Sequence, residues 1–491
     1  MGLLLLLLPL VAVLLFALAA KKMHMDCINI IVLLSMLAVG IYITSEVLSG
    51  GSVTYSFLGG FFYVDAISAI FLDIVLIIGI LCGIYSVGYL NEEKKHGNID
   101  TTKIRTYYIL LQTFVFTMIL ALTARNMGIM WIAIEATTLA SAFLVGFYND
   151  KKAIEAAWKY LIICSVGIVI ALLGIVFIHL SYVQLSGIKG IGLNWTSLYE
   201  NAKALDTPQL KLAFIFILIG FGTKAGLAPM HTWLPDAHSQ APSPISAMLS
   251  GVLLNSAMYA IIRAVSVLNK NLGSGKYSGT LLITFGLISM AVGAVFILTQ
   301  KDYKRLLAYS SIEHMGIISI SIGIFTPLSI FAGMLHSINH SFTKSMLFLS
   351  SGGVLLKYKT KEISKVSRVL KVLPVTGTAM LLGMFAIAGT PPFGIFTSEL
   401  YVITSAFKAG KTFVGVAVIA LLAFVFAGMA FSVFKIFYPS ERDCDVKPGE
   451  PSRLMAVTVI ILLAVVTVGG LYVPNEVRHL IEAARNIIIG G

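Results

Sequence analysis

Ionisable side chains stand inside segments of this chain that are otherwise apolar. Lys224 follows Gly-Phe-Gly-Thr and precedes Ala-Gly-Leu-Ala-Pro, and Glu135 follows Met-Trp-Ile-Ala-Ile. An ionised group at membrane depth costs about 2.5–3.5 kcal/mol on insertion scales, so such residues mark ion pathways. At about 4 Å and an effective dielectric near 20, a lysine and a glutamate attract by about 4 kcal/mol. Lysine, unlike arginine, can release its proton, so moving Glu135 away would turn Lys224 into a proton donor.

A second set of polar residues follows one face of a single helix. His336, His340 and Lys344 are spaced i, i+4 and i+8, which places them in one stripe. Histidine titrates near neutral pH and therefore suits a proton relay. Two histidines one turn apart on one helix cannot be opposite axial ligands of one haem, and a zinc site requires more ligands than this stripe offers. The stripe predicts proton transfer and not metal binding.

Four further residues lie deep in apolar segments and extend the polar series. Asn255 can hold water and relay a proton through hydrogen bonds without carrying charge, although adhesion between helices remains an alternative role. Glu313 and His314 lie side by side within a later segment. Glu399 follows a Pro-Pro sequence and is predicted to pass the proton outward. Together these residues predict a proton pathway through successive helices.

Other polar residues have roles that the sequence leaves open. His231 and His238 follow the glycine- and proline-rich stretch after Lys224, where they can form a proton entry or simply lie at the membrane interface. Lys304 opens a helix and is either a member of the pathway or an ordinary topology signal. Asp65 is expected near a membrane edge, and neither it nor Asp73 is assigned a role.

The elements that must position these residues are membrane-spanning helices. The chain has 491 residues, of which 58% are hydrophobic and only 12% are charged. Apolar runs of about 20 residues, each long enough to cross a bilayer, recur along the whole length. We expect an all-α polytopic membrane protein of about fourteen spans, with no soluble catalytic domain. The predicted spans are 2–20, 27–48, 64–90, 106–123, 126–147, 154–180, 208–237, 244–267, 279–299, 303–323, 328–356, 372–409, 411–438 and 452–473.

The Lys and Arg residues are distributed unequally between the two sides of the membrane. The net charge is +12, yet with fourteen spans 22 Lys and Arg fall on one side and 11 on the other. Cytoplasmic loops carry such an excess, so both termini are expected outside a cytoplasmic membrane. The distribution argues against a nucleic-acid partner. The most basic loop, 357–371, is explained by topology and anionic lipid contact, or by docking to a partner subunit.

Two predicted spans are interrupted in the same way, which suggests an internal repeat. Aligning Pro229 with Pro392 also aligns Asp236 with Glu399, at an offset of 163 residues. Matching interruptions in two halves mark the binding sites of inverted-repeat transporters. We therefore expect helices 4–8 and 9–13 to form two inverted five-helix repeats with helices 7 and 12 broken. The chain then divides into N-terminal helices 1–3 (1–105), a first repeat (106–270), a second repeat (271–440) and a last helix with its tail (441–491).

Signatures of cofactors are not found in the sequence. Cys27, Cys82, Cys164 and Cys444 are scattered, without the spacing of an iron–sulfur site or a disulfide framework. The chain has no phosphate-binding loop and no dinucleotide fingerprint. Any redox chemistry is therefore expected in a partner subunit, with no cofactor or metal in this chain.

Three motifs resemble the proton-translocating antiporter-like subunits. They are Trp131-Ile-Ala-Ile-Glu135, Lys224-Ala-Gly-Leu-Ala-Pro-Met-His-Thr-Trp-Leu-Pro-Asp-Ala-His238 and Asp302-Tyr-Lys-Arg-Leu-Leu-Ala-Tyr-Ser-Ser311. That family includes the large membrane subunits of respiratory complex I, Mrp-type Na+/H+ antiporter subunits and membrane subunits of energy-converting nickel–iron hydrogenases. The resemblance covers nearly the whole chain and also implies fourteen helices in two inverted repeats.

The resemblance assigns roles to individual residues. Glu135 and Lys224 match the family's glutamate–lysine pair, Glu399 matches the ionisable residue of the second broken helix, and His340 matches a histidine of helix 11. Many complex I paralogues have lysine where this chain has Asn255. That asparagine, together with Ser311-Ile-Glu313-His-Met-Gly, resembles the formate-hydrogenlyase and membrane-bound hydrogenase branch. No long lateral helix follows the last span, which argues against the most distal complex I subunit.

Three classes of function remain open. The first is a proton-pumping subunit, without a catalytic centre of its own, in a hydrogenase or complex I-like assembly that contains further antiporter-like subunits. The second is an Na+/H+ antiporter of Mrp type, and the third is a structural anchor whose polar residues are relics. The transported ion, the direction of transport and the electron acceptor are not defined by the sequence.

Overall fold

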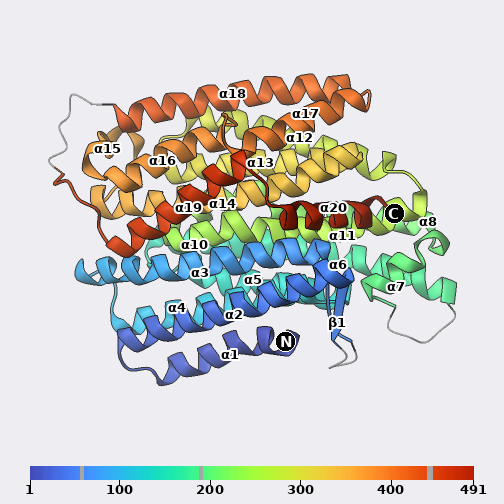
Figure 1. The fold of residues 1–491 in the computed structure, drawn as a ribbon, viewed down its shortest axis with the longest axis horizontal. Helices are drawn as coiled ribbons and strands as arrows, with labels where there is room; N and C mark the ends of the chain where they lie inside the picture. The colour runs from blue at the N-terminus through green and yellow to red at the C-terminus, as the bar shows by residue number, and fades with distance from the viewer. Residues whose placement is uncertain (56–59, 187–191, 439–445, 491) are drawn as a thin grey trace.

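The computed structural model describes residues 1–55, 60–186, 192–438 and 446–490, and consists of long helices running side by side (Figure 1). Cys444 lies outside the described residues. The helices are α1 (Gly2–Leu18), α2 (Lys22–Gly50), α3 (Ala66–Lys95), α4 (Thr101–Thr123), α5 (Met127–Val145), α6 (Lys151–Ser186), α7 (Trp195–Glu200), α8 (Thr207–Ala225), α9 (Leu234–Gln240), α10 (Ser243–Met248), α11 (Leu254–Leu272), α12 (Lys276–Thr299), α13 (Tyr303–Ile324), α14 (Pro327–Tyr358), α15 (Val369–Val372), α16 (Pro374–Ile387), α17 (Gly394–Lys408), α18 (Thr412–Phe437), α19 (Arg453–Leu471) and α20 (Asn475–Ile489).

Most of these helices are membrane spans by length and composition. Within the described ranges, eleven helical segments are long and apolar enough to cross a bilayer, and α1 and α16 are shorter apolar helices. The prediction of an all-α polytopic membrane protein is therefore confirmed. The count of fourteen spans, the inverted relation of the repeats and the four-part division of the chain remain predictions.

Polar residues in the short connections fix where several helices begin. Asp100 accepts a hydrogen bond from the backbone of Lys103 at the start of α4, and Asp302 accepts from Lys304 and Arg305 at the start of α13. These side chains satisfy backbone N–H groups that have no partner within the helix. These caps therefore hold the starts of α4 and α13 at defined residues.

The two predicted interruptions are present. The first separates α8 from α9 and contains a 3₁₀ turn at Met230–Trp233; the second separates α16 from α17. Each contains a cis X–Pro bond, Ala228–Pro229 in the first and Pro391–Pro392 in the second. The structure adds one irregularity that was not predicted, a π-helical segment at Leu249–Leu253 between α10 and α11.

Short elements gather at one end of the bundle. β1 (Ser52–Tyr55) pairs antiparallel with β2 (Phe62–Asp65) and forms a short hairpin. The amphipathic helix α20 packs its buried face on α3, α11 and α14. Gly2 lies against the side chains of Tyr55 and Phe62, so both chain ends are at the hairpin end (Figure 1).

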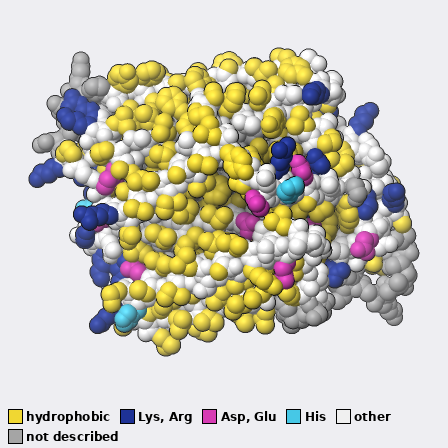
Figure 2. All heavy atoms as spheres, in the orientation of Figure 1, with side chains coloured by type: hydrophobic (Ala, Val, Ile, Leu, Met, Phe, Trp, Pro, Cys, Tyr) yellow, Lys and Arg dark blue, Asp and Glu magenta, His cyan; other side chains and the backbone are white. Residues whose placement is uncertain are grey.

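Burial divides the helices into an inner and an outer set. The spanning windows of Ser243–Leu272 and Tyr303–Ile324 are wholly buried, whereas the windows in α18 and α19 are one-third buried. Apolar side chains cover the flank of the bundle, and Lys and Arg gather at the end near α15 (Figure 2). This pattern is that of a bundle whose outer helices face lipid.

Small residues allow two neighbouring helices to pack closely. A side chain at Gly279 would meet the carbonyl of Gly323, and one at Gly286 would meet the carbonyl of Gly316. These contacts join α12 to α13 along their length. Membrane helices approach closely where small residues line the interface, so α12 packs closely against α13.

Candidate functional site

Lys224 lies in the last turn of α8 and is fully buried. The left-handed conformation of Gly226 ends the helix directly after it. The ammonium donates hydrogen bonds to Thr138 Oγ1 at 2.6 Å and to the hydroxyl of Tyr160 at 2.7 Å. The same ammonium lies 4.8 Å from the centre of the Tyr160 ring, next to the hydroxyl edge.

Glu135 reaches Lys224 through Thr138. The Thr138 hydroxyl donates to the Glu135 carboxylate at 3.2 Å, and the Ser165 hydroxyl donates to the other carboxylate oxygen at 2.6 Å. Among the described residues no direct ion pair joins Glu135 to Lys224. The prediction of a direct pair at about 4 Å is therefore wrong, because one threonine hydroxyl occupies the space between the two charges.

Asn255 lies at the start of α11, directly after the π-helical segment. Its amide donates to Ser341 Oγ at 2.7 Å, and its buried carbonyl oxygen accepts no hydrogen bond from the described residues. Within the π-helical segment, Ser250 contacts Ser311 on α13 at 2.7 Å. π-helical segments are frequent at functional sites. This one turns polar groups of the α10–α11 span toward both α13 and α14.

The predicted stripe on α14 is buried and faces α13. His336, His340 and Lys344 have no exposed surface. The Lys344 ammonium donates to Ser310 Oγ at 2.6 Å and to the carbonyl of Leu307 at 2.8 Å. A hydroxyl and a carbonyl thus hold the ammonium inside the protein, close to the histidines on the same face of the helix.

Three histidines form a cluster between α13, α14 and the second interruption. His314 Nδ1 lies 3.0 Å from His336 Nε2, and its other ring nitrogen lies 2.9 Å from the carbonyl of Ile387. His336 Nδ1 lies 2.9 Å from Ser398 Oγ on α17. The His340 ring centre is 5.5 Å from that of His314, and neither of its nitrogens has a hydrogen-bond partner among the described residues.

Two glutamates end the series near the second interruption. Glu313 Oε2 lies 3.3 Å from His314 Nε2. The Glu399 carboxylate lies against Gly389, where a Cβ would collide with one of its oxygens. Gly389 also has a φ of +69°, so the position requires glycine on both counts.

Three further candidates, Lys304, His238 and His231, lie in or next to α9. The buried Lys304 donates to the carbonyl of Ala241 at 2.7 Å and thereby holds the end of α9. His238 is buried, stacks on Phe348 at 4.9 Å and has no hydrogen-bond partner among the described residues. His231 is nearly buried and its ring lies 6.4 Å from that of Tyr309. Lys304 therefore anchors the α9 end.

The loop 359–368 lies beside the same end of α9. Lys361 donates to the carbonyl of Ser239 at 2.5 Å and to the side chain of Gln240. Burial lowers the pKa of Lys361, while the carboxylate of Asp302 acts in the opposite direction. The basic loop predicted from its charge is thus packed partly into the protein, and its lysine binds the helix that follows the first interruption.

The predicted residues therefore fall into two groups. Glu135 and Lys224 form one with α6, and Asn255, Lys344, Glu313, Glu399 and the histidines form the other around α13 and α14. No hydrogen bond among the described residues joins Lys224 to Asn255. Sequence reasoning missed three members of the first group, Thr138, Tyr160 and Ser165. Only Thr138 had a sequence signal, its position three residues after Glu135 on the same helical face.

A metal site is not evident in the part of the chain that the structure describes. No group of three or more His, Cys, Asp or Glu side chains there is arranged to hold a metal ion. The absence of a cofactor remains an expectation.

Comparison with known proteins agrees with this architecture. A family model for the transmembrane region of NADH:quinone oxidoreductases and Mrp antiporters matches residues 124–425. A model for the N-terminus of complex I chain 5 matches residues 59–97.

Two solved structures share the fold. One is the Mrp complex from Dietzia sp., with a TM-score of 0.85, 19% identity and coverage of 99% of this chain and 97% of that chain. The other is an archaeal membrane-bound sulfane sulfur reductase, with a TM-score of 0.86, 22% identity and the same two coverages.

Curated relatives include hydrogenase components. The hydrogenase-4 component F homolog of Methylacidiphilum infernorum is 38% identical over 419 residues, covering 85% of this chain and 87% of that protein. Hydrogenase-4 component B of Escherichia coli is 26% identical over 448 residues, 86% of this chain and 64% of that protein. An Na(+)/H(+) antiporter subunit of Alkalihalophilus pseudofirmus is 29% identical over 458 residues, 87% of this chain and 54% of that protein.

The fold and the site together define a class of protein. It is a helical membrane protein with two interrupted helices and buried titratable residues beside each interruption. The chain belongs to the family of NADH:quinone oxidoreductase and Mrp antiporter transmembrane subunits. The resemblance found in the sequence is confirmed.

Proposed function

We propose that this chain is a proton-translocating subunit of a membrane-bound hydrogenase or complex I-like assembly, in which partner subunits perform the redox chemistry. The observation that carries the proposal is the series of titratable side chains within the bundle, partly buried on α5 (Glu135) and buried on α8, α13, α14 and α17. Such groups are expensive within a membrane and mark proton relays. The relatives named as hydrogenase-4 components support this kind of assembly.

The first half of the proposed path is the Glu135–Thr138–Lys224 bridge. Hydrogen bonds of 2.6 and 3.2 Å place the two charges roughly 5 Å apart. At that distance and an effective dielectric near 20 they attract by ~3 kcal/mol. Moving one charge across 100 mV costs about 2.3 kcal/mol, so weakening this attraction is large enough to drive one proton. The redox step in partner subunits displaces charge, the pair loosens and Lys224 releases its proton.

The second half passes from Asn255 to the histidine cluster. Lys224 gives its proton to water held beside Asn255, whose carbonyl oxygen has no hydrogen-bond donor among the described residues. The proton continues over Lys344 and the histidines and leaves through Glu399, which differs chemically from the lysine of the first half.

We place both termini outside the cytoplasmic membrane, with the loop 357–371 in the cytoplasm. Other antiporter-like subunits and the lipid bilayer surround the chain.

The test uses inverted membrane vesicles that contain the native complex. Reduced methyl viologen supplies electrons, and hydrogen evolution and proton uptake are measured in the same vesicles. Lys224→Ala should keep the complex assembled and abolish proton uptake. Uptake at the wild-type ratio to hydrogen in that variant would show that the proposed path is incorrect.

A second candidate is sodium–proton exchange, favoured by the similarity to the Na(+)/H(+) antiporter subunit of Alkalihalophilus pseudofirmus. In this case, uptake of radiolabelled sodium would accompany proton release in the same vesicles. Proton uptake that is unchanged without sodium favours the first function over the second.

A further inference from the structure

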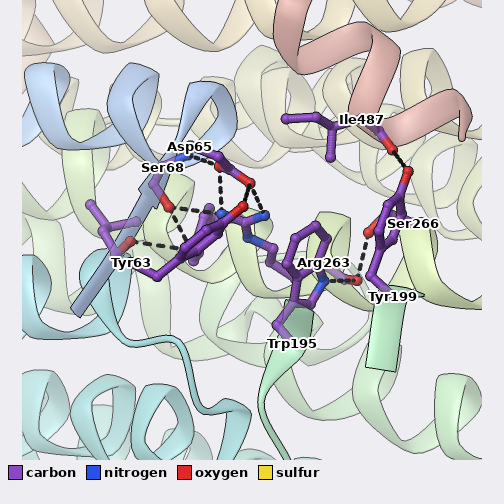
Figure 3. A network of polar contacts seen from close by, with 10 residues as sticks. Tyr63, Asp65, Ser68, Trp195, Tyr199, Arg263, Ser266 and Ile487 are labelled. Atoms are coloured by element: carbon purple, nitrogen blue, oxygen red, sulfur yellow. Dashed lines mark hydrogen bonds and ion pairs between the residues drawn. The ribbon is translucent and has the colours of Figure 1, made fainter. Parts of the chain in front are cut away.

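A buried ion pair outside the relay joins the hairpin end of the bundle to α11. Arg263 and Asp65 are 2% and 1% exposed. The guanidinium donates to both carboxylate oxygens, at 2.6 and 2.7 Å, and to Ser68 Oγ at 2.7 Å (Figure 3). Such a bidentate pair fixes distance and orientation together. Asp65, to which the sequence assigned no role, is thus one half of a buried ion pair.

Aromatic rings hold the same guanidinium from other sides. The centres of the Trp195 and Tyr259 rings lie 4.2 and 4.9 Å from it. The Trp195 indole also donates to the carbonyl of Arg263 at 3.0 Å (Figure 3). Tyr199, stacked on Trp195, donates to the carbonyl of Ile487 on α20 at 2.7 Å. The Asp65–Arg263 network, made of these residues and Ser68, thus links β2, α3, α7, α11 and α20.

The network also reaches α11 and α5, two of the helices that carry proposed relay residues. Arg263 lies eight residues after Asn255 on α11, about 12 Å along the axis. The segment before α7 pairs with the start of α5, where Met127 donates to the carbonyl of Leu193 at 2.9 Å and Trp195 donates to Arg125. Glu135 lies eight residues after Met127 on that helix.

We propose that Asp65 and Arg263 are positioning residues for the relay, which hold α11 so that Asn255 keeps its hydrogen bond to Ser341. This inference rests on the proposed function. A hydrogen bond of 2.7 Å is lost when its partners separate by about 1 Å. A buried ion pair adds little net stability compared with apolar residues of the same volume. The pair instead fixes the position of α11 relative to the four other elements of the network.

The experiment is a double-mutant comparison in the native complex. Arg263→Lys keeps the charge but cannot bind both carboxylate oxygens in the planar fork. We expect proton uptake per hydrogen evolved to fall about tenfold, the change that a loss of ~1.4 kcal/mol produces. In the Asn255→Ala background, Arg263→Lys should have less than about a twofold further effect, because its influence passes through Asn255. Arg478→Lys, an exposed arginine of α20, is the matched control and should leave the ratio unchanged.

Each other outcome is informative. Equal tenfold losses in both backgrounds would mean that Arg263 acts on the whole structure, which overturns the inference and leaves the relay intact. Wild-type transport by Asn255→Ala alone would remove Asn255 from the relay and the positioning role with it. If Arg263→Lys does not assemble, Asp65→Asn with Arg263→Gln removes both charges and leaves no unpaired one. Normal uptake in that double variant also overturns the inference.

Discussion

Thr138 provides the sharpest test of the first half of the path. Thr138→Val keeps the shape of the side chain and removes the hydroxyl that bonds both Lys224 and Glu135. A hydrogen bond to a charged group contributes about 1.5–3 kcal/mol. Adding about 1.5 kcal/mol to the proton-transfer barrier slows transfer roughly tenfold, and adding about 3 kcal/mol slows it roughly 150-fold. We therefore expect proton uptake per hydrogen evolved to fall between these limits.

The chain offers a matched control one residue away. Thr137 is equally buried, but its hydroxyl donates to the carbonyl of Ile134 in its own helix at 2.6 Å. Thr137→Val should keep normal uptake, and Thr138→Ser should retain most of it because the hydroxyl is kept. Assembly is checked by the amount of intact complex on native gels. Wild-type uptake in Thr138→Val, or equal losses in both valine variants, would refute the bridging role.

Three further variants probe the rest of the path. Lys224→Arg should assemble but transport at least about tenfold less than wild type, since arginine does not release its proton; vesicle uptake measures this. Gly389→Ala should displace the Glu399 carboxylate and reduce uptake strongly, whereas Gly410→Ala, also at positive φ but in open space, should only lower thermal stability. His314→Ala removes the contacts to both neighbours of the cluster and should reduce uptake about tenfold or more; uptake equal to wild type would exclude the histidine route.

Local sequence features predicted much of the fold because they act over a few residues. Glycine and proline near Lys224 and Pro392 predicted both interruptions, and these are where α8 and α16 end. The i, i+4, i+8 spacing predicted the buried stripe of α14. Each of these features depends on backbone geometry within one helix.

Contacts between helices were the part that the sequence did not provide. Thr138 follows Glu135 by three residues on the same helical face. A threonine within a membrane helix commonly bonds its own backbone, as Thr137 does, so this spacing alone did not reveal the bond to Lys224. Tyr160 and Ser165 come from α6, whose rotation toward α5 is set by packing. Arg263 lies near the end of a span, where an arginine is usually a topology signal. Only the structure shows that it forms an ion pair with Asp65.

The enclosure of α13 and of the α10–α11 span has a consequence for how the protein meets its membrane. Because their spanning windows are wholly buried, these helices touch no lipid, while α18 and α19 form part of the outer layer. A change in bilayer thickness or lipid composition is absorbed first by tilting of that outer layer. The inner helices are thus mechanically insulated from changes in the surrounding lipid. Proton transport by this chain should accordingly vary little between membranes of different thickness.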